Sequence, residues 1–563
     1  MLEDILIWKK KADLHPKLAQ ELVNMNDEQL NDAFYTNIAF GTAGMRGLLG
    51  AGTNRINYYT VRKATVGYAQ ALKKWGKANK GVAISYDNRH LSRDFAFDCA
   101  NLLATYDIPT YVYEALRPTP MLSFAVRYHN CAGGIMITAS HNPKEYNGYK
   151  LYDDTGCQLI PDLANEVVDL VNAVKDPLSI VVNPSEQQKE LIHILGKEMD
   201  DAYLKEVLDI QLNKDLDKSN ISIAFSPEHG TANGIVQRMY DMTGYRYYDV
   251  KEQCTPDPDF SATESPNPEE AKAYAKVLEL ANDKQCDVVL VCDPDADRMG
   301  VAALSNGEYQ LLSGNQSGAV LIEYIFSQLK EKGLMPENPV MFNTVVTSDL
   351  GEAIASYYGV ETEKTLTGFK YIGSKIHHYE QTHEKNYVFG YEESYGSLIR
   401  PFVRDKDSPQ ACLMLAEAAC YYKHHGKTLV DVLNELYQRF GTYLETQLSI
   451  SLPGESGAKK LAAMMKDLRD NPLTEIGGLK VVKRWDFKTR EIEENGNILP
   501  LEGFDISDVL KYQLEDGSWI AVRPSGTEPK CKVYFCIKAV DLATCHNKLD
   551  CMQANMKAIM LKD

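Results

Sequence analysis

Residues Gly133–Tyr152, GGIMITASHNPKEYNGYKLY, decide how this chain is expected to fold. The apolar run Ile135–Thr138 has the composition of a buried β-strand, and it leads into Ser140 and His141. A serine beside an imidazole just past a strand end is a place where a nucleophile can act. The alternative is a surface turn, because Ser and the following Asn142-Pro143 are common turn residues.

The same pattern of an apolar run followed by a polar loop recurs three more times. The runs are DVVLVC at Asp287–Cys292, YVF at Tyr387–Phe389 and WIAV at Trp519–Val522. Apolar β-like runs that alternate with amphipathic helical stretches are typical of α/β domains with largely parallel sheets. Because ligands of such sheets bind beyond the carboxyl ends of the strands, we expect the four loops to converge on one cleft.

The length of 563 residues is too great for a single core, and it predicts roughly three to five domains. One functional loop per domain gives four domains, separated in polar or glycine-bearing stretches. The predicted domains are 1–210, 211–312, 313–430 and 431–563.

Three aspartates follow the second run at alternate positions, Asp293, Asp295 and Asp297, and Arg298 comes next. In a turning loop this spacing lets three carboxylates converge on one hard cation. Mg²⁺ is favoured because it takes oxygen ligands and often keeps a substrate phosphate in its shell. A solvated acidic turn is the alternative, and the position directly after a buried strand favours the metal site.

The remaining loops carry groups that suit phosphate and sugar. Arg523–Thr527 offers a guanidinium, two hydroxyls and a glycine, which suits a phosphate but also a helix N-cap. Gly390–Gly396 contains Glu392 and Ser394, which can hydrogen-bond sugar hydroxyls or simply form an acidic turn. The glycine-rich segment Phe40–Gly47, with Arg46, can support a phosphate.

Composition narrows the class of protein. The chain is 44% hydrophobic and 25% charged, as in soluble globular proteins. It has no apolar run approaching ~18 residues and no signal-peptide core at its start. The net charge of −18 disfavours nucleic acid and anionic membranes as partners. The 12 cysteines form neither a CxxC pair nor a Cys-His ligand pattern, which predicts reduced thiols in a cytoplasmic protein.

Together, TASHNP, DPDADR, EES and RPSGTEP, in this order, resemble the motifs of the α-D-phosphohexomutase family, and within it the longer phosphoglucomutase branch. The resemblance extends from Gly41 to Lys530. It implies an α/β fold with four domains around a central cleft. Three domains would have related mixed or parallel α/β cores, and the smaller, mobile C-terminal domain would be α+β. It also implies an isomerase-class phosphotransferase that acts on sugar phosphates as a monomer or small homo-oligomer.

The resemblance also gives roles to individual residues. It implies that Ser140 carries the phosphoryl group and that Lys150 is a general acid or base. Mg²⁺ would be held by the three aspartates and a phosphoserine oxygen. The implied site comprises, for catalysis, Ser140, His141, Lys150, Arg46 and Arg298; for substrate binding, Thr367, Gly368, Glu392, Ser394, Lys406, Arg523, Ser525, Gly526 and Thr527; and for the metal, Ser140, Asp293, Asp295 and Asp297.

The implied reaction interconverts glucose 1-phosphate and glucose 6-phosphate, with glucose 1,6-bisphosphate as intermediate and activator. Mannose-accepting members carry a histidine where this chain has Gly396, so EESYG resembles the glucose type. Phosphomannomutase, phosphopentomutase and bisphosphate-synthase activities stay open on the same scaffold. A serine-based sugar phosphatase and a silent sugar-phosphate-binding protein are alternatives of other classes. Pro294 and Ala296 replace two glycines that are common in the family's metal loop, and we expect them to stiffen it.

Overall fold

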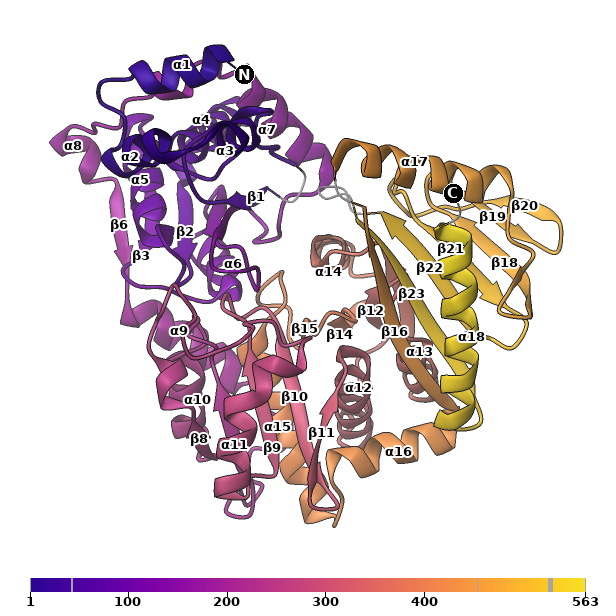
Figure 1. Cartoon of the computed structure of the whole chain (residues 1–563). Helices are drawn as coiled ribbons and strands as arrows, with labels where there is room; N and C mark the ends of the chain where they lie inside the picture. The colour runs from indigo at the N-terminus through magenta and orange to yellow at the C-terminus, as the bar shows by residue number, and fades with distance from the viewer. Residues whose placement is uncertain (1, 42–43, 453, 525–529, 562–563) are drawn as a thin grey trace.

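The computed structural model describes residues 2–41, 44–452, 454–524 and 530–561. Four β-sheets follow one another along the chain, one within each predicted range (Figure 1). We call the parts that carry them domains I to IV. The sheets of domains I to III contain parallel and antiparallel pairs, whereas that of domain IV is antiparallel. The predicted fold class is therefore confirmed, while the domain boundaries stay a prediction.

Domain I has six strands in the order β1-β5-β4-β2-β3-β6. Strands β2 and β4 are buried along their whole length, as expected for strands with both faces covered. The strands are β1 (Met45–Leu48), β2 (Val82–Tyr86), β3 (Thr110–Tyr113), β4 (Gly133–Ile137), β5 (Tyr146–Tyr152) and β6 (Ile192–Leu195). The helices are α1 (Leu2–Lys10), α2 (Pro16–Asn24), α3 (Asp27–Phe34), α4 (Tyr58–Lys74), α5 (Ser92–Thr105), α6 (Thr119–Tyr128), α7 (Pro161–Ala173), α8 (Glu186–Lys189) and α9 (Lys197–Leu208).

Domain II has the strand order β11-β10-β9-β7-β8, and domain III has β13-β12-β14-β15. The elements of domain II are β7 (Ser222–Ser226), α10 (Ile235–Thr243), β8 (Arg246–Asp249), α11 (Ala275–Lys284), β9 (Val288–Cys292), β10 (Met299–Ser305) and β11 (Glu308–Leu312). Those of domain III are α12 (Gly314–Glu331), β12 (Pro339–Thr344), α13 (Asp349–Tyr357), β13 (Glu361–Thr365), α14 (Phe369–Thr382), β14 (Asn386–Tyr391), β15 (Ser397–Leu398), α15 (Ser408–His424) and α16 (Leu429–Phe440).

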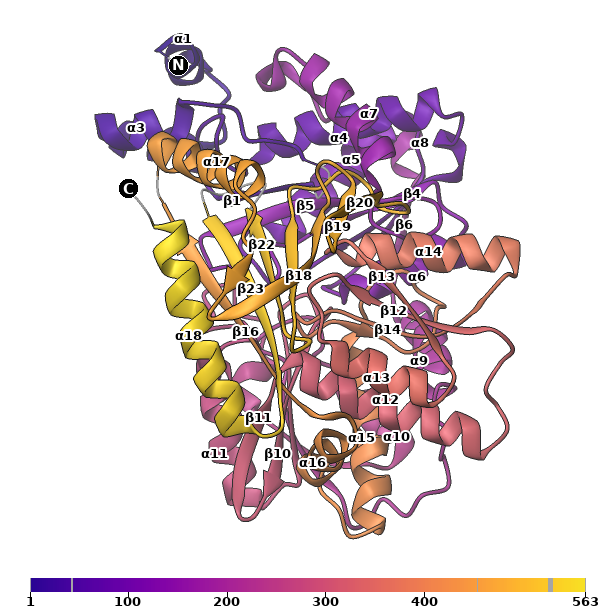
Figure 2. The same ribbon diagram turned by 90° about the vertical axis from the view of Figure 1, so that its right-hand side faces the viewer.

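The sheet of domain IV is covered differently on its two faces. Helices α17 and α18 lie beside this sheet (Figure 2). Along β22, Ile520 and Val522 join a hydrophobic cluster with these two helices, whereas Trp519 and Ala521 join the cluster that extends into domain III. This alternation follows from the two-residue period of a strand. The elements are β16 (Thr442–Ser451), α17 (Gly454–Asp470), β17 (Glu475–Ile476), β18 (Leu479–Asp486), β19 (Glu491–Glu494), β20 (Asn497–Pro500), β21 (Leu510–Leu514), β22 (Trp519–Pro524), β23 (Lys530–Ala539) and α18 (Leu542–Met560).

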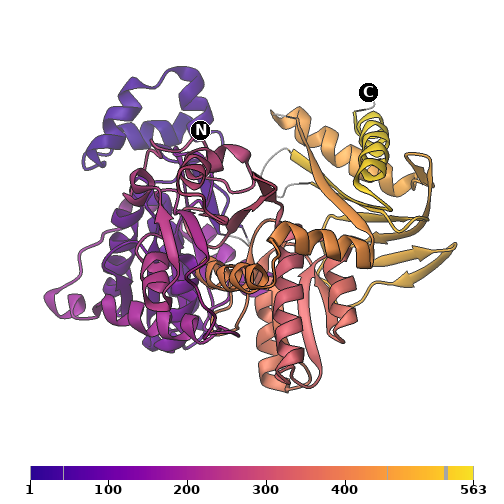
Figure 3. The same ribbon diagram turned by 90° about the horizontal axis from the view of Figure 1, so that it is seen from below.

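A single cluster of buried apolar side chains reaches from Ala83 in β2 to Cys536 in β23, so the domains pack against one another. Seen from below, domains I and II lie on one side and domain IV on the other, with elements of domain III between them (Figure 3). Within the described ranges, none of the helices has the length and apolar character needed to span a bilayer.

The four strands expected to lead into functional loops are present as β4, β9, β14 and β22. Their limits differ by at most two residues from the expected ones. Thr138, for example, lies just past the end of β4, where its hydroxyl accepts a hydrogen bond from the Ser140 backbone N–H (2.8 Å). Thr138 therefore helps to form the loop instead of extending the strand.

Candidate active site

Ser140 lies at the centre of the site. Its backbone has a φ of 51°, in the left-handed region that few residues other than glycine adopt. Such backbone strain often occurs at functional positions, where the surrounding structure holds it in place. The Ser140 hydroxyl is buried and donates a hydrogen bond to Asp293 Oδ2 at 2.8 Å. The structure thus brings together two loops that are 153 residues apart in the sequence.

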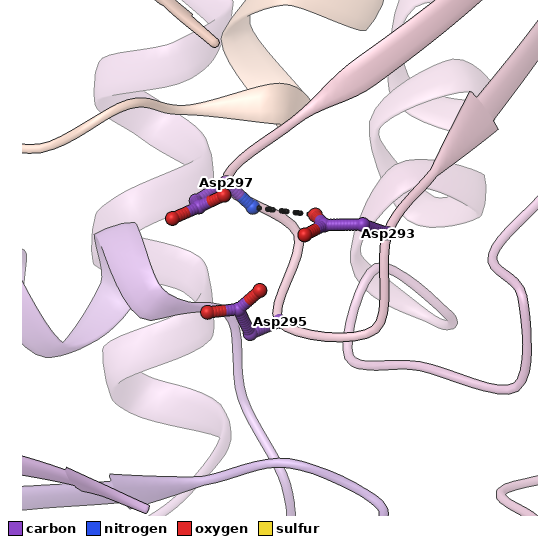
Figure 4. Close-up of side chains that lie close together, drawn as sticks. All are labelled: Asp293, Asp295 and Asp297. Carbon is purple, nitrogen blue, oxygen red and sulfur yellow. Dashed lines mark hydrogen bonds between the residues drawn. The ribbon is translucent and has the colours of Figure 1, made fainter. Parts of the chain in front are cut away.

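The three aspartates of the loop after β9 gather within one turn of the chain (Figure 4). One carboxylate oxygen from each of Asp293, Asp295 and Asp297 lies within 4.8 Å of the others, and all three side chains are buried. The backbone N–H groups of Asp297 and Arg298 donate to Asp293 Oδ1 at 3.1 and 3.0 Å, which fixes the shape of the turn. Ala296, between Asp295 and Asp297, has a φ of 53°, so it occupies a conformation that glycine adopts without strain.

This donor set fits a divalent cation. Three buried carboxylates provide hard oxygen ligands. Asp295 Oδ1 is buried and accepts no hydrogen bond from the described residues. Burial raises the pKa of Asp293 well above its usual value, and the neighbouring carboxylates raise it further. A cation would relieve this crowding of like charges.

Two lysines partly neutralise the aspartates. Lys150 Nζ, on β5, lies 3.0 Å from Asp295 Oδ2, and Lys406 Nζ lies 3.1 Å from Asp297 Oδ2. Burial opposes ionisation of Asp295, but the Lys150 ammonium holds the pKa of this carboxyl below its usual range. Lys150 is therefore not a solvated surface charge, because it is largely buried and paired inside the site.

His141 lies beside the serine, and Arg46 and Arg298 lie close to His141. His141 Nδ1 lies 3.3 Å from Ser140 Oγ. Burial lowers the pKa of His141 well below its usual value, and the two arginines lower it further, so the ring is neutral at pH 7. Arg46 donates to Asn142 Oδ1 at 2.9 Å. Arg298 donates to the Glu269 carboxylate at 2.6 Å, a pairing that the sequence did not indicate.

Residues of the expected sugar loop lie next to Lys406. Glu392 is buried, and its Oε1 accepts a hydrogen bond from the backbone N–H of Gly368 at 2.8 Å. Thr367 and Ser394 are partly exposed. A Cβ atom at Gly396 would lie 1.9 Å from Lys406 Cδ, so a side chain at this position is incompatible with the observed lysine.

The phosphate loop is described only at its start. Arg523 lies near the end of β22, paired with Lys532 of β23. Burial raises the pKa of Tyr371, on α14, and the Arg523 guanidinium acts in the opposite direction, so domain IV places a positive charge beside domain III. Ser525, Gly526 and Thr527 lie outside the described residues.

Thr119 belongs to the site although it was not identified from the sequence. Its backbone N–H donates to Asp295 O at 2.9 Å, and its hydroxyl donates to Asp295 Oδ2 at 3.0 Å. The residue begins α6 of domain I, yet it holds an aspartate of domain II. A threonine after proline resembles any helix start, so only the fold reveals this contact.

Comparison with known proteins places the chain in one family. Its domains match the family models described as phosphoglucomutase/phosphomannomutase alpha/beta/alpha domains I, II and III, at residues 37–177, 201–306 and 313–440. The C-terminal domain model of the same family matches residues 458–536.

Two relatives and two solved structures illustrate the similarity. A phosphoglucomutase from Staphylococcus aureus (strain MRSA252) is 38% identical over 550 residues, which cover 97% of this chain and 98% of the relative. A phosphoglucomutase from Staphylococcus epidermidis (strain ATCC 35984) is 39% identical over 521 residues, covering 91% and 92%. A putative phosphomannomutase from Thermus thermophilus has a TM-score of 0.69, with 22% identity and coverage of 93% and 99%.

The open form of the Paramecium phosphoglucomutase pp63/parafusin has a TM-score of 0.67, with 20% identity and coverage of 94% and 95%. At these identities the two structures show a shared fold. The family models and the Staphylococcus relatives show more, because they match most of the sequence itself. The chain belongs to the phosphoglucomutase/phosphomannomutase family.

Proposed function

We propose that the chain is a phosphoglucomutase that interconverts glucose 1-phosphate and glucose 6-phosphate. Ser140 would carry the phosphoryl group between turnovers, and glucose 1,6-bisphosphate would be the intermediate. One observation supports this proposal most strongly. In a chain of this family, the buried Ser140 hydroxyl, in a strained loop, donates a hydrogen bond to Asp293, one of three clustered carboxylates.

Asp293, Asp295 and Asp297 would hold the metal, which we propose is Mg²⁺. When bound, Mg²⁺ supplies positive charge next to the transferring phosphoryl group, where it offsets charge in the transition state. Lys150 and Lys406 already partly neutralise two of the carboxylates, Asp295 and Asp297. Thr119 orients Asp295 by a further hydrogen bond.

In the proposed reaction, the bond from phosphorus to Ser140 Oγ breaks as a new bond forms to the free sugar hydroxyl. The proton of that hydroxyl must leave, and Ser140 Oγ must take up a proton. In the second half, the other phosphoryl group of the bisphosphate returns to Ser140: its bond to the sugar oxygen breaks as the bond to Oγ forms, and the proton moves from Oγ to the sugar oxygen. We assign proton transfer to Lys150, because it is the lysine that reaches the metal loop from the strand following the serine loop. Arg46 and Arg298 lie close to His141 and would offset negative charge, whereas the neutral His141 ring lies within hydrogen-bond reach of Ser140 Oγ.

Sugar hydroxyls would contact Glu392 and Ser394, with Thr367 and Gly368 beside them. Arg523, together with Ser525, Gly526 and Thr527, would bind the phosphate that does not react. The glucose preference is supported by Gly396, which stands where mannose-accepting members carry a histidine; a Cβ atom there would lie 1.9 Å from Lys406 Cδ. A cytoplasmic location and a monomeric or small homo-oligomeric state stay predictions from the sequence.

The test is to incubate the purified chain with Mg²⁺, glucose 1-phosphate and a catalytic amount of glucose 1,6-bisphosphate. Glucose 6-phosphate and inorganic phosphate are both quantified. We expect glucose 6-phosphate to form without net phosphate release. Stoichiometric phosphate release would instead indicate a sugar phosphatase, and neither product would indicate a silent binding protein. Mannose, ribose and glucosamine 1-phosphates in the same assay would rank the alternative substrates.

A further inference from the structure

The backbone of the serine loop is held by one buried guanidinium group. Arg89 Nη2 donates to the carbonyl oxygens of Ser140 and Asn142, both at 2.5 Å. Arg89 Nη1 donates to those of Pro143 and Tyr146 at 2.8 and 3.1 Å. Four carbonyl groups of one short loop therefore point at a single side chain, whose planar fork suits several acceptors at once.

Arg89 is itself fixed from within domain I. Its side chain is fully buried, and Arg89 Nε lies 3.3 Å from Asp87 Oδ2. Asp87 Oδ1 accepts hydrogen bonds from the Ser92 hydroxyl at 2.7 Å and from the Arg89 backbone N–H at 3.0 Å. A buried and paired charge of this kind has little freedom to move, so it can transmit a fixed position to the loop.

A segment of domain II completes the arrangement. The Arg89 guanidinium lies over the Phe260 ring, 5.2 Å from its centroid, and Phe260 is buried with a φ of 52°. Asn88 Nδ2 donates to Asp257 O at 2.8 Å. Asp259 Oδ1 lies 3.1 Å from His90 Nε2 and 3.4 Å from Lys144 Nζ, the latter on the serine loop itself. The two domains therefore meet at the back of the loop as well as at the metal site.

We infer that Arg89 is a positioning residue for phosphoryl transfer and that Phe260 braces it from domain II. This inference rests on the function proposed above. The charge of Arg89 reaches Asp295 and Asp293 through space, and a lysine at this position keeps that charge. Among the described residues, no hydrogen bond or ion pair joins Arg89 to these aspartates or to the expected sugar-binding residues, so its fixed geometry acts through the loop. Its role is to keep the Ser140 backbone in its left-handed conformation with the hydroxyl directed at Asp293. Substrate binding depends on other loops and is expected to be largely independent of Arg89.

The experiment compares Arg89→Lys and Phe260→Leu with the wild-type chain. Lysine keeps the charge beside Asp87 but cannot hold four carbonyl groups in fixed directions. A displacement of the loop of about 1 Å is enough to lower kcat about 100-fold, with KM for glucose 1-phosphate changed less than about threefold. Leucine at position 260 removes the aromatic face and is expected to lower kcat about fivefold. Arg93→Gln is the control, because Arg93 is exposed and lies over Phe97, and it should change kcat less than about twofold.

The split between kcat and KM separates positioning from loss of the fold or of substrate binding. If Arg89→Lys does not fold, Phe260→Leu carries the test, since it leaves the arginine and its ion pair intact. The inference is overturned if folded Arg89→Lys retains the wild-type kcat. If Arg89→Lys does not fold, a wild-type kcat in Phe260→Leu overturns it. A loss of activity that appears entirely in KM also overturns it. A wild-type chain without mutase turnover would contradict the proposed function instead.

Discussion

The substitution Gly396→Ala, which adds one methyl group, should lower activity by displacing Lys406 from the site. The Cβ atom of alanine would lie 1.9 Å from Lys406 Cδ and 2.7 Å from Lys406 Cγ, so the lysine must leave its place. Gly396 does not have a positive φ, so alanine causes no backbone strain of its own. The contacted atoms are in the middle of a side chain whose ammonium group is held between Asp297 and Asp405, so a small adjustment cannot relieve the clash.

The size of the effect follows from these ion pairs. Lys406 Nζ lies 3.1 Å from Asp297 and 3.0 Å from Asp405. With an effective dielectric constant of about 20, each attraction amounts to about 5 kcal/mol before the cost of desolvation. Breaking a buried pair from one side costs about 3–5 kcal/mol, and a lysine that swings toward solvent recovers part of this. We therefore expect Gly396→Ala to lower the free energy of unfolding by about 2–3 kcal/mol. Because the displaced ammonium group also neutralises Asp297 in the site, we expect kcat/KM to fall by about 30- to 150-fold.

The assay is kcat/KM for glucose 1-phosphate in the wild-type chain, Gly396→Ala, Lys406→Met and the double variant. If Gly396→Ala acts by displacing Lys406, kcat/KM of the double variant should be no lower than that of Lys406→Met, because methionine forms no ion pair that the alanine could disrupt. The reasoning is refuted if Gly396→Ala stays within about threefold of the wild type, or if the two effects multiply.

Substitutions at three further positions test the metal loop. Asp295→Asn should raise the Mg²⁺ concentration for half-maximal activity at least about 100-fold, since it removes one charged oxygen ligand; an unchanged metal titration would exclude Asp295 as a ligand. Thr119→Val keeps the side-chain volume but removes the donor to Asp295 Oδ2, so it should raise the Mg²⁺ concentration for half-maximal activity about tenfold. A titration curve identical to that of the wild type would show that Thr119 does not orient the carboxylate. Ala296→Gly should leave kcat within about twofold of the wild type, because the φ of 53° at this position suits glycine. Ala296→Val should lower the melting temperature by several degrees, because a β-branched residue is strained at this φ. Equal melting temperatures of the two variants would contradict this expectation.

Much of the site was predictable from local sequence. Each functional loop follows an apolar run, and the runs correspond to β4, β9, β14 and β22. The alternate spacing of Asp293, Asp295 and Asp297 was sufficient to indicate that their carboxylates converge, and the structure brings one oxygen of each within 4.8 Å of the others. These features depend on the chemistry of adjacent residues, which the sequence displays directly.

The contacts that join the domains were not predictable in this way. Thr119 and Asp295 are 176 residues apart, and Asn88 and Asp257 are 169 residues apart. Such pairs arise from how complete sheets pack, and no local pattern marks them.

The backbone conformation of Ala296 was also not predictable from the sequence. We expected this residue to stiffen the metal loop, and the structure shows that it holds a left-handed conformation there.

The most direct test of the proposed function is the covalent state of Ser140 during turnover. The chain is incubated with glucose 1,6-bisphosphate carrying a phosphorus label, digested, and the labelled peptide is sequenced by mass spectrometry. We expect the label on Ser140, its transfer to sugar when unlabelled glucose 1-phosphate is added, and no labelling of Ser140→Ala, which should retain substrate binding but lose nearly all turnover. A label on another residue, or turnover by Ser140→Ala at the wild-type rate, would contradict the assignment of Ser140 as the phosphoryl carrier.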